Sequence, residues 1–264
     1  MKQNTILVTG ASSGIGQALA LRCAAPGRVL HLSGRDAARL AHTEAACVAA
    51  GAAVRARVLD VADQAAMQNW IVQAGPLDLV LACAGISGGP HPATPERAAQ
   101  EDPEQIRRIL RVNLDGVLNT VLPAIAVMER QPAEAGVRGR IAAIASVAAS
   151  VSSPKAPTYC ASKAAVDRWM VATGANLAPG GILMSSVCCG FVRSRMTAAN
   201  DFPMPGLMDA DRAARLIMRG IAAGRRRIVF PWWMQAGARA MDLLPLRLSE
   251  AILARQPAKT PTAS

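Results

Sequence analysis

Short apolar runs alternate along this chain with longer runs in which apolar residues recur at helical spacing. The short runs predict strands and the longer ones predict helices. Their alternation is typical of βαβ units, in which a parallel sheet has helices on both faces and right-handed crossovers. The predicted strands are 4–8, 28–32, 53–59, 77–83, 141–145, 182–188 and 228–230. The predicted helices are 17–25, 36–50, 64–73, 103–130, 158–177 and 209–223, the last of them capped by Asp209.

The length and composition favour one large α/β domain. The chain has 264 residues, of which 52% are hydrophobic, and it shows no internal repeat or linker. We expect one domain, 1–255, which includes a helical extension from about residue 231, and then a flexible tail, 256–264. No uncharged apolar run is long enough to predict a membrane span, and the N-terminus lacks the apolar region of a signal peptide. We therefore expect a cytoplasmic protein.

The formal net charge of +11 does not require a nucleic-acid partner. The basic residues are mostly scattered arginines with few aromatic residues among them, and the one cluster is Arg225-Arg226-Arg227. Attraction of an anionic cofactor and general solubility suffice to explain the charge. The six cysteines show no C-x-x-C spacing, so we expect buried, reduced thiols and no metal site.

A glycine-rich turn, Gly10, Gly14 and Gly16, follows the first predicted strand and opens the first predicted helix. Glycines let the backbone approach a pyrophosphate, and the helix N-terminus offers free N–H groups and a partial positive charge. Ser12 and Ser13 add hydroxyl donors. A tight turn that binds nothing is the alternative.

The same turn, residues 10–14, also fits the G-x-S-x-G pattern of a hydrolase nucleophile. Here it follows the very first strand, which leaves no upstream loop for an oxyanion hole. None of His31, His42 and His91 has an obvious acidic partner to orient it. These points disfavour a hydrolase.

Tyr159, the only tyrosine, precedes Lys163 by four residues. On a helix the two side chains share one face, with Cβ atoms about 5–6 Å apart. A nearby ammonium lowers the pKa of a phenol, so the pair is interpreted as a proton-transfer device. A surface tyrosine beside a surface lysine is the alternative.

The glycine turn from Thr9 to Gly16, then Ser146, then the Y-x-x-x-K pair closely resemble the short-chain dehydrogenases/reductases. The resemblance runs from about Thr5 to Ser194. It implies a Rossmann-like, doubly wound parallel sheet of about seven strands, and NAD(P)-dependent hydride transfer between an alcohol and a ketone or aldehyde. It also leads us to expect a homodimer or homotetramer.

The resemblance implies roles for particular residues. Ser146, thirteen residues before Tyr159, would hydrogen-bond the substrate oxygen, and Tyr159 would be the general acid or base. Lys163 would lower the pKa of Tyr159 and hold the nicotinamide ribose, and Asn113 would anchor a water leading to Lys163. Asp60 would contact the adenine. Cofactor binding is expected of Gly10, Ser12, Ser13, Gly14, Ile15, Gly16, Arg35, Asp60, Val61, Ala84, Gly85, Tyr159, Lys163, Gly190, Val192 and Ser194.

Two cysteines depart from the family pattern. Cys83 stands where the family has asparagine in N-A-G, and Cys189 replaces the proline before Gly190. Neither change removes a proton-transfer group, so we expect lower stability or looser cofactor binding. A weakly active dinucleotide sensor or scaffold on the same fold is the alternative function.

The second predicted strand ends in Gly34-Arg35-Asp36. An acidic residue at this point binds the ribose diol of NAD, whereas an arginine accepts the 2′-phosphate of NADP. Arg35 therefore favours NADP(H), with NAD(H) as the alternative. Asp36 is expected to cap the next helix, and would bind the diol only if the register shifted by two residues.

Two further segments bear on the substrate and on partners. The loop after Gly85 and the segment 197–208, with Phe202, Met204, Leu207 and Met208, predict a wall for a small apolar ketone, aldehyde or alcohol. The alternative is that these side chains only cover the core. The stretch 231–254 holds tryptophans, leucines and arginines around Pro245, so it could pack on the domain, form a subunit contact or lie on a membrane surface.

Overall fold

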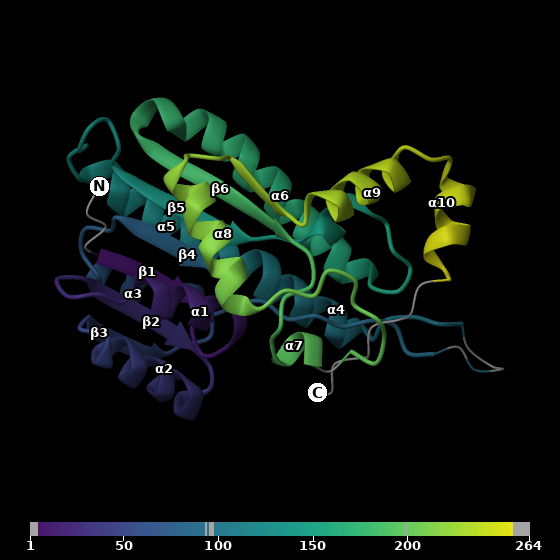
Figure 1. The fold of residues 1–264 in the computed structure, drawn as a ribbon, viewed down its shortest axis with the longest axis horizontal. Coiled ribbons are helices and arrows are strands. Elements are labelled where there is room, and N and C mark those ends of the chain that lie inside the picture. The colour runs from purple at the N-terminus through teal and green to yellow at the C-terminus, as the bar shows by residue number, and fades with distance from the viewer. Residues whose placement is uncertain (1–4, 93, 95–97, 199, 256–264) are drawn as a thin grey trace.

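Seven parallel strands form the central sheet of the computed structural model, which describes residues 5–92, 94, 98–198 and 200–255. The strands are β1 (Thr5–Thr9), β2 (Val29–Gly34), β3 (Ala53–Val58), β4 (Leu79–Ala82), β5 (Gly139–Ile144), β6 (Ile182–Cys189) and β7 (Arg227–Phe230). Their order is β3-β2-β1-β4-β5-β6-β7, which confirms the predicted doubly wound sheet (Figure 1). The strand order reverses between β1 and β4.

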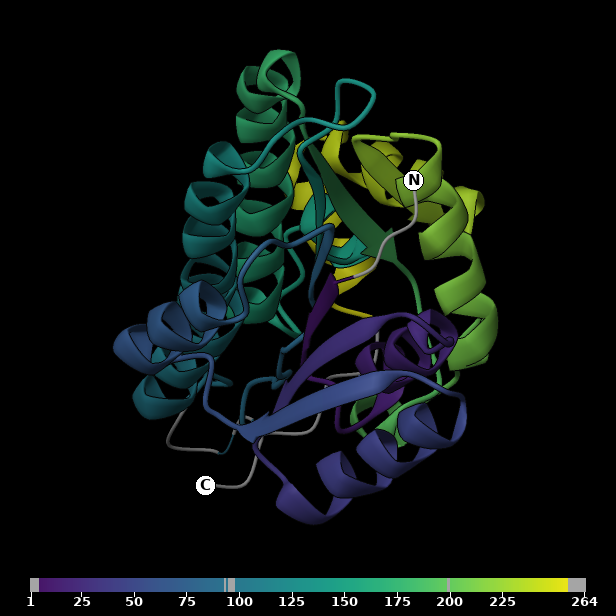
Figure 2. The same cartoon turned by 90° about the vertical axis from the view of Figure 1, so that its left-hand side faces the viewer.

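Helices cover both faces of the sheet (Figure 2). One face carries α1 (Gly14–Cys23), α2 (Ala37–Ala49) and α8 (Ala210–Ala222), and the other carries α3 (Gln64–Gln73), α5 (Gly116–Arg130) and α6 (Pro157–Leu177). Successive strand residues point to opposite faces. Ile6 and Val8 therefore pack in the first layer, and Leu7 packs in the second. Because both faces of the sheet centre are buried, the central strand β4 is apolar without interruption, whereas the edge strand β3 carries Arg55 and Arg57 and is largely exposed.

The predicted helix 103–130 consists of three consecutive parts: α4 (Pro103–Leu110), the π-helical turn η1 (Arg111–Asp115) and α5. It is the one helix among the described residues that is long and apolar enough to cross a membrane. Its apolar side chains Val117, Val121 and Met128 are buried against the sheet. The core helix of an α/β layer meets the same criteria of length and composition.

The structure differs from the predicted boundaries where pairing or tertiary contacts decide them. β2 continues to Gly34, because its pairing with β3 continues to Gly34↔Val58. Asp209 precedes α8 but does not cap it with its side chain, and pairs instead with Arg193 at 2.8 Å. A short helix that was not predicted, α7 (Arg195–Ala198), overlaps the start of the segment 197–208.

After β7, two helices form the C-terminal extension: α9 (Trp232–Asp242) and α10 (Leu246–Leu253). Pro245 lies at the break between them, as its restricted backbone predicts. Figure 1 shows that both helices extend away from the sheet at one end of the molecule. The predicted tail, 256–264, lies outside the described residues.

Candidate active site

A cavity of about 1400 Å³ opens at the carboxyl ends of the strands, where the sheet order reverses. Most predicted site residues line it together: Gly10, Ser12, Ser13, Gly14, Ile15, Gly16, Arg35, Val61, Ala84, Gly85, Ser146, Tyr159, Lys163, Gly190, Val192 and Ser194. Drug-sized ligands fill cavities of about 300–1000 Å³. This cleft therefore has room for a cofactor and a substrate together.

The glycine turn packs too closely to admit side chains. A Cβ on Gly10 would lie 2.8 Å from the backbone of Ala84, and one on Gly16 would lie 2.3 Å from the carbonyl oxygen of Gly10. Gly10 also has a φ of 65°, which glycine adopts without strain. The tight turn brings the N-terminus of α1 to the cleft, where its N–H groups and partial positive charge can bind an anion.

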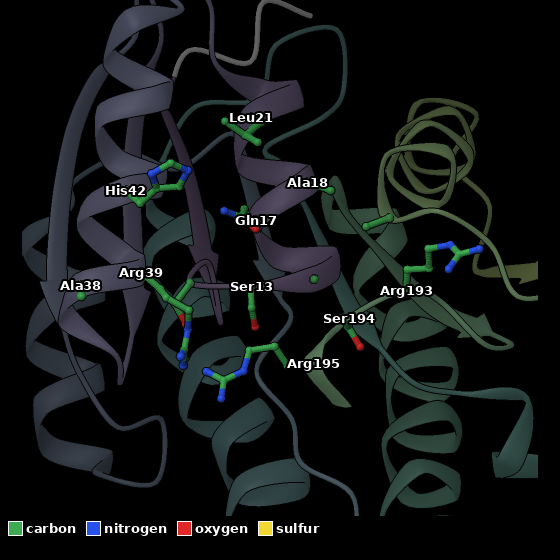
Figure 3. A pocket seen from close by; sticks show the side chains of 13 residues that line it. Ser13, Gln17, Ala18, Leu21, Ala38, Arg39, His42, Arg193, Ser194 and Arg195 are labelled. Carbon is green, nitrogen blue, oxygen red and sulfur yellow. The ribbon is translucent and has the colours of Figure 1, made fainter. Parts of the chain in front are cut away.

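Three arginines add positive charge at this end of the cleft. Arg35 follows β2 and lines the cavity, as predicted. Arg39 on α2 and Arg195 in α7 line both the cavity and an adjoining pocket of about 580 Å³. In Figure 3 the Arg195 side chain extends toward Ser13 and Arg39. Neither Arg39 nor Arg195 was predicted, although Arg195 directly follows Ser194 and Arg39 lies one helical turn beyond Arg35.

The side chains of Ser146 and Tyr159 both line the cleft, and Ser146 lies near enough to the phenol to lower the pKa of Tyr159. Ser146 follows β5, and its Oγ accepts the backbone N–H of Ala148 at 3.1 Å. The Ser146 hydroxyl donates only a long bond, 3.4 Å, to the carbonyl oxygen of Cys189. Because a hydroxyl rotates about its C–O bond, Ser146 can redirect its proton to a ligand oxygen beside Tyr159.

Glu101 holds the start of the helix that carries Tyr159. Its Oε2 accepts the backbone N–H of Thr158 at 3.0 Å and also the Thr158 hydroxyl. The buried carboxylate thus caps α6, whose own N-cap residue, Ala156, gives no side-chain cap. Negative charge at a helix N-terminus is favourable. Glu101 was not predicted, because it lies 57 residues from Thr158 and no local pattern marks it.

Burial decides the proton affinities of Tyr159 and Lys163. The Lys163 Nζ donates to the carbonyl oxygen of Ile144 at 2.7 Å and lies 6.0 Å from the centre of the Tyr159 ring. Loss of solvation lowers the pKa of Lys163 to about 8. The same loss raises the pKa of Tyr159, although the hydrogen bond with Ser146 opposes the rise. The predicted lowering of the Tyr159 pKa is therefore wrong for the protein alone, because the loss of solvation destabilises the phenolate more than the interaction with Ser146 stabilises it.

Asn113 lies behind the cleft and not in its wall. It is fully buried in the π-helical turn η1, a feature often found at functional sites. Its Oδ1 accepts the Ile86 N–H at 2.8 Å, and its Nδ2 donates to the Ile86 carbonyl and to the Ser162 Oγ, both at 3.0 Å. A Cβ on Gly85 would lie 3.3 Å from the Asn113 Oδ1 and 3.4 Å from the Lys163 Nζ. Both groups thus flank one glycine, and the water path from Asn113 to Lys163 stays a prediction.

Asp60 is the other predicted residue that does not line the cleft. Its exposed side chain folds back over its own turn, where Oδ1 accepts the N–H of Ala62 at 3.0 Å. Leu59 and Val61 line the cavity on either side of it. The contact of Asp60 with an adenine stays a prediction, and its apolar neighbours form this part of the wall.

The two cysteines that replace the family's asparagine and proline take part in the site through their backbones. The Cys83 N–H donates to the Thr9 hydroxyl at 3.2 Å, and the Cys189 carbonyl accepts from Ser146. All six cysteines are free thiols and five are buried, as predicted. Neither replacement displaces Ser146 or Tyr159 from the cleft.

Apolar side chains surround the part of the cleft near Ser146 and Tyr159. Of the predicted wall residues, Phe202 lines the cavity. The others, which the lining does not include, are Met204, Leu207 and Met208. The C-terminal extension contributes instead, and the apolar wall consists of Val151, Phe191, Phe202, Pro203, Pro205, Trp233, Met234, Met241 and Leu253.

The family of this chain follows from comparison with known proteins. The profile of the family described as short chain dehydrogenase matches residues 4–202. The chain therefore belongs to the short-chain dehydrogenases, and it is an oxidoreductase.

Three relatives illustrate the likeness. An uncharacterized oxidoreductase of Myxococcus xanthus is 34% identical over 262 residues, which are 97% of this chain and 98% of that protein. The granaticin polyketide synthase putative ketoacyl reductase 1 of Streptomyces violaceoruber is 38% identical over 199 residues, 72% of this chain and 68% of that protein. A short chain dehydrogenase/reductase of Burkholderia phymatum, solved in complex with NAD, matches with a TM-score of 0.77 at 24% identity over 100% of both chains.

The cleft fits the dinucleotide that this family binds. The glycine turn and the N-terminus of α1 suit a pyrophosphate, and the arginines suit phosphate groups. Small or apolar residues, among them Ala84, Gly85 and Val192, offer flat surfaces for rings. These features suit the cofactor class of the family, NAD(P), without distinguishing NAD from NADP.

Proposed function

We propose that this chain is an NADP(H)-dependent oxidoreductase that interconverts a small apolar ketone or aldehyde and its alcohol. The observation that carries the proposal is that Ser146, Tyr159 and Lys163 line one cleft together with apolar side chains, with Lys163 one helical turn beyond Tyr159 on α6. When bound, the reduced nicotinamide supplies the hydride.

The chain's own residues provide the proton chemistry. Ser146 and Tyr159 hold a carbonyl oxygen between their hydroxyl groups. Burial raises the pKa of Tyr159, so the phenol keeps its proton at neutral pH and can give it to that oxygen as negative charge develops there. The ammonium of Lys163, fixed to the Ile144 carbonyl, then stabilises the phenolate left behind. A protonated Tyr159 favours the reductive direction at neutral pH.

The end of β2 favours NADP(H) over NAD(H). A Cβ on Gly34 would lie 2.9 Å from the Ser12 Oγ, so a diol-binding acid does not fit there. Both oxygens of Asp36 are engaged: Oδ1 accepts the Arg39 N–H at 2.9 Å, as its predicted capping role requires, and Oδ2 pairs with the Arg39 guanidinium at 2.7 Å. These two observations support binding of the 2′-phosphate by Arg35, because a planar guanidinium suits a phosphate well.

The relatives and the cleft wall support a carbonyl substrate. The Streptomyces violaceoruber relative is named a putative ketoacyl reductase, which supports reduction of a ketone. The aromatic and methionine side chains of the wall support an apolar body beside that ketone. The homodimer or homotetramer expected from the family stays a prediction.

NADPH absorbance over a panel of apolar ketones and aldehydes tests the proposal. Wild-type protein should turn over at least one substrate, and Tyr159→Phe should lower its turnover about a hundredfold or more, the range for losing an acid–base group. NADPH binding, followed by tryptophan fluorescence, should be the same in both proteins. A near-normal rate in the variant would refute the role of Tyr159, and tight NADPH binding without any turnover by the wild type would favour the sensor alternative.

A further inference from the structure

The segment 232–253, which comprises α9 and α10, exposes more large apolar side chains than any other part of the described chain. It exposes Trp232, Trp233, Leu243, Leu246, Leu248 and Ile252. The remaining described residues expose Leu21, Val48, Val58, Val72, Leu122 and Met196, each on a different helix or strand. Leu243 is 86% exposed and Trp232 is 75% exposed, whereas none of the scattered six exceeds 56%. Scattered apolar residues are ordinary on a surface, but such a cluster marks an interaction site.

The same two helices also contribute the apolar wall of the cleft. Trp233, Met241 and Leu253 line the cavity, and Trp232, Leu243 and Leu246 do not. Figure 1 shows the extension projecting from the body of the molecule beside the cleft segments. Trp233 is both exposed and part of the cavity lining, so the exposed apolar residues adjoin the apolar wall of the cleft.

The charges on the extension favour one kind of partner. Arg239, Arg247 and Arg255 are exposed in or next to the cluster, beside the exposed Asp242 and Glu250, and the whole chain carries +11. The segment, with Arg255 just after it, carries three arginines against two acidic residues, and the rest of the chain adds most of the positive charge. An anionic surface would therefore attract the protein as a whole. Tryptophans and leucines beside arginines are the composition of helices that lie at a lipid–water interface.

We propose that α9 and α10 dock on an anionic lipid surface and place the apolar mouth of the cleft against it. Trp232, Leu243 and Leu246 enter the interface, and Arg239 and Arg247 contact the lipid head groups. A carbonyl compound dissolved in the lipid could then reach the cleft along these adjoining apolar residues. The docking itself is independent of the proposed catalytic roles, so each can fail without the other.

Vesicle sedimentation with the full-length protein tests the docking. The vesicles contain either phosphatidylcholine alone or an equal mixture with phosphatidylglycerol. The test variant combines Trp232→Ser, Leu243→Ser and Leu246→Ser, and the matched control combines Val48→Ser, Val72→Ser and Leu122→Ser, which are exposed elsewhere. NADPH binding reports folding for every protein, and a second variant, Arg239→Gln with Arg247→Gln, keeps the apolar cluster intact.

Wild type and the matched control should bind the phosphatidylglycerol vesicles, less strongly at high salt, and bind phosphatidylcholine vesicles weakly. The partition coefficient of the apolar test variant should be at least about tenfold lower, because its three serine side chains no longer bury apolar surface in the lipid. The arginine variant should bind the phosphatidylglycerol vesicles less than the wild type does, and should bind phosphatidylcholine vesicles to the same extent as the wild type. Equal partition of test variant and control, or no partition of the wild type, would overturn the proposal. Light scattering that shows a wild-type dimer split by the test variant, with vesicle binding unchanged, would assign the cluster to a second copy instead.

Discussion

The burial of Lys163 should make the stability of the fold depend on pH in a way that one substitution removes. Its side chain is 4% exposed, and the pKa of Lys163 is lowered from 10.5 to about 8 by loss of solvation. Between these two values the unfolded chain holds the proton more tightly than the folded one. The free energy of unfolding therefore rises with pH across this window. The destabilising contribution of Lys163 is full below pH 8 and absent above its unfolded pKa.

The magnitude follows from the same two pKa values. At about 1.4 kcal/mol per pH unit, the difference between them is worth about 3 kcal/mol in total. About 2 kcal/mol of this should appear between pH 7.5 and pH 9.5. Lys163→Met keeps the length and the apolar stem of the side chain but cannot titrate. It also loses the bond to the Ile144 carbonyl, which lowers stability by a similar amount at every pH.

Urea unfolding followed by tryptophan fluorescence at pH 7.5 and pH 9.5 measures this effect. In the unfolded chain the cysteines and Tyr159 also titrate near this range, but they do so in every variant, so the difference between proteins isolates the lysine. Lys155→Met is the matched control, because Lys155 is a partly exposed lysine four residues before Tyr159. Wild type and Lys155→Met should gain about 2 kcal/mol more than Lys163→Met on going to the higher pH. Parallel pH dependence in all three proteins would refute the reasoning that Lys163 loses its proton in the fold.

Two further substitutions test other parts of the structure. Arg227→Ala should lower the free energy of unfolding by about 3 kcal/mol in urea at pH 7, because it leaves the nearly buried carboxylate of Asp167, 2.8 Å from Arg227 in the wild type, without its counter-ion. Burial alone would raise the pKa of Asp167, but Arg227 and Ser186 hold that pKa below its usual value. The wild type should therefore lose this stabilisation as the pH falls below about 4. If the stability of Arg227→Ala depended on acid pH in the same way as that of the wild type, the role of the pair would be contradicted. Arg35→Ala should raise KM for NADPH about tenfold or more and leave KM for NADH unchanged, whereas an equal rise for both would place the 2′-phosphate elsewhere.

The strand and helix order could be predicted because most of the strands are buried on both faces. Ile6, Leu7 and Val8 face alternate layers, so the run is apolar throughout and separates clearly from the amphipathic helices. The ends of elements could not be predicted in the same way. β2 continues to Gly34 only because β3 lies beside it, and Asp209 turns from its helix to Arg193. Both outcomes depend on neighbours that the local sequence does not contain.

The same distinction separates the predictable from the unpredictable parts of the site. The glycine turn and the Tyr159–Lys163 pair are local patterns, so their place in the cleft could be predicted. Glu101 and Arg195 could not be assigned in this way, because the segments that bring them to the site are fixed by tertiary packing. The direction of the Tyr159 pKa was missed for a related reason, since it depends on how completely the fold excludes water from the phenol.

One face of α6 explains why stability and proton chemistry are linked in this fold. Tyr159, Lys163 and Asp167 follow one another at four-residue spacing, and each is tied to a different place in the sheet. Tyr159 contacts Ser146 after β5, Lys163 donates to the Ile144 carbonyl within β5, and Asp167 pairs with Arg227 on β7.

These three contacts hold the polar face of α6 against the sheet and exclude water from that face. That burial lowers the pKa of Lys163 and raises the pKa of Tyr159, so the contacts that position the phenol also keep it in the protonated form from which it can donate. A substitution that loosened this face would let water in, lower the Tyr159 pKa and raise that of Lys163. Position and protonation state at this site therefore have a common physical origin in the packing of one helix.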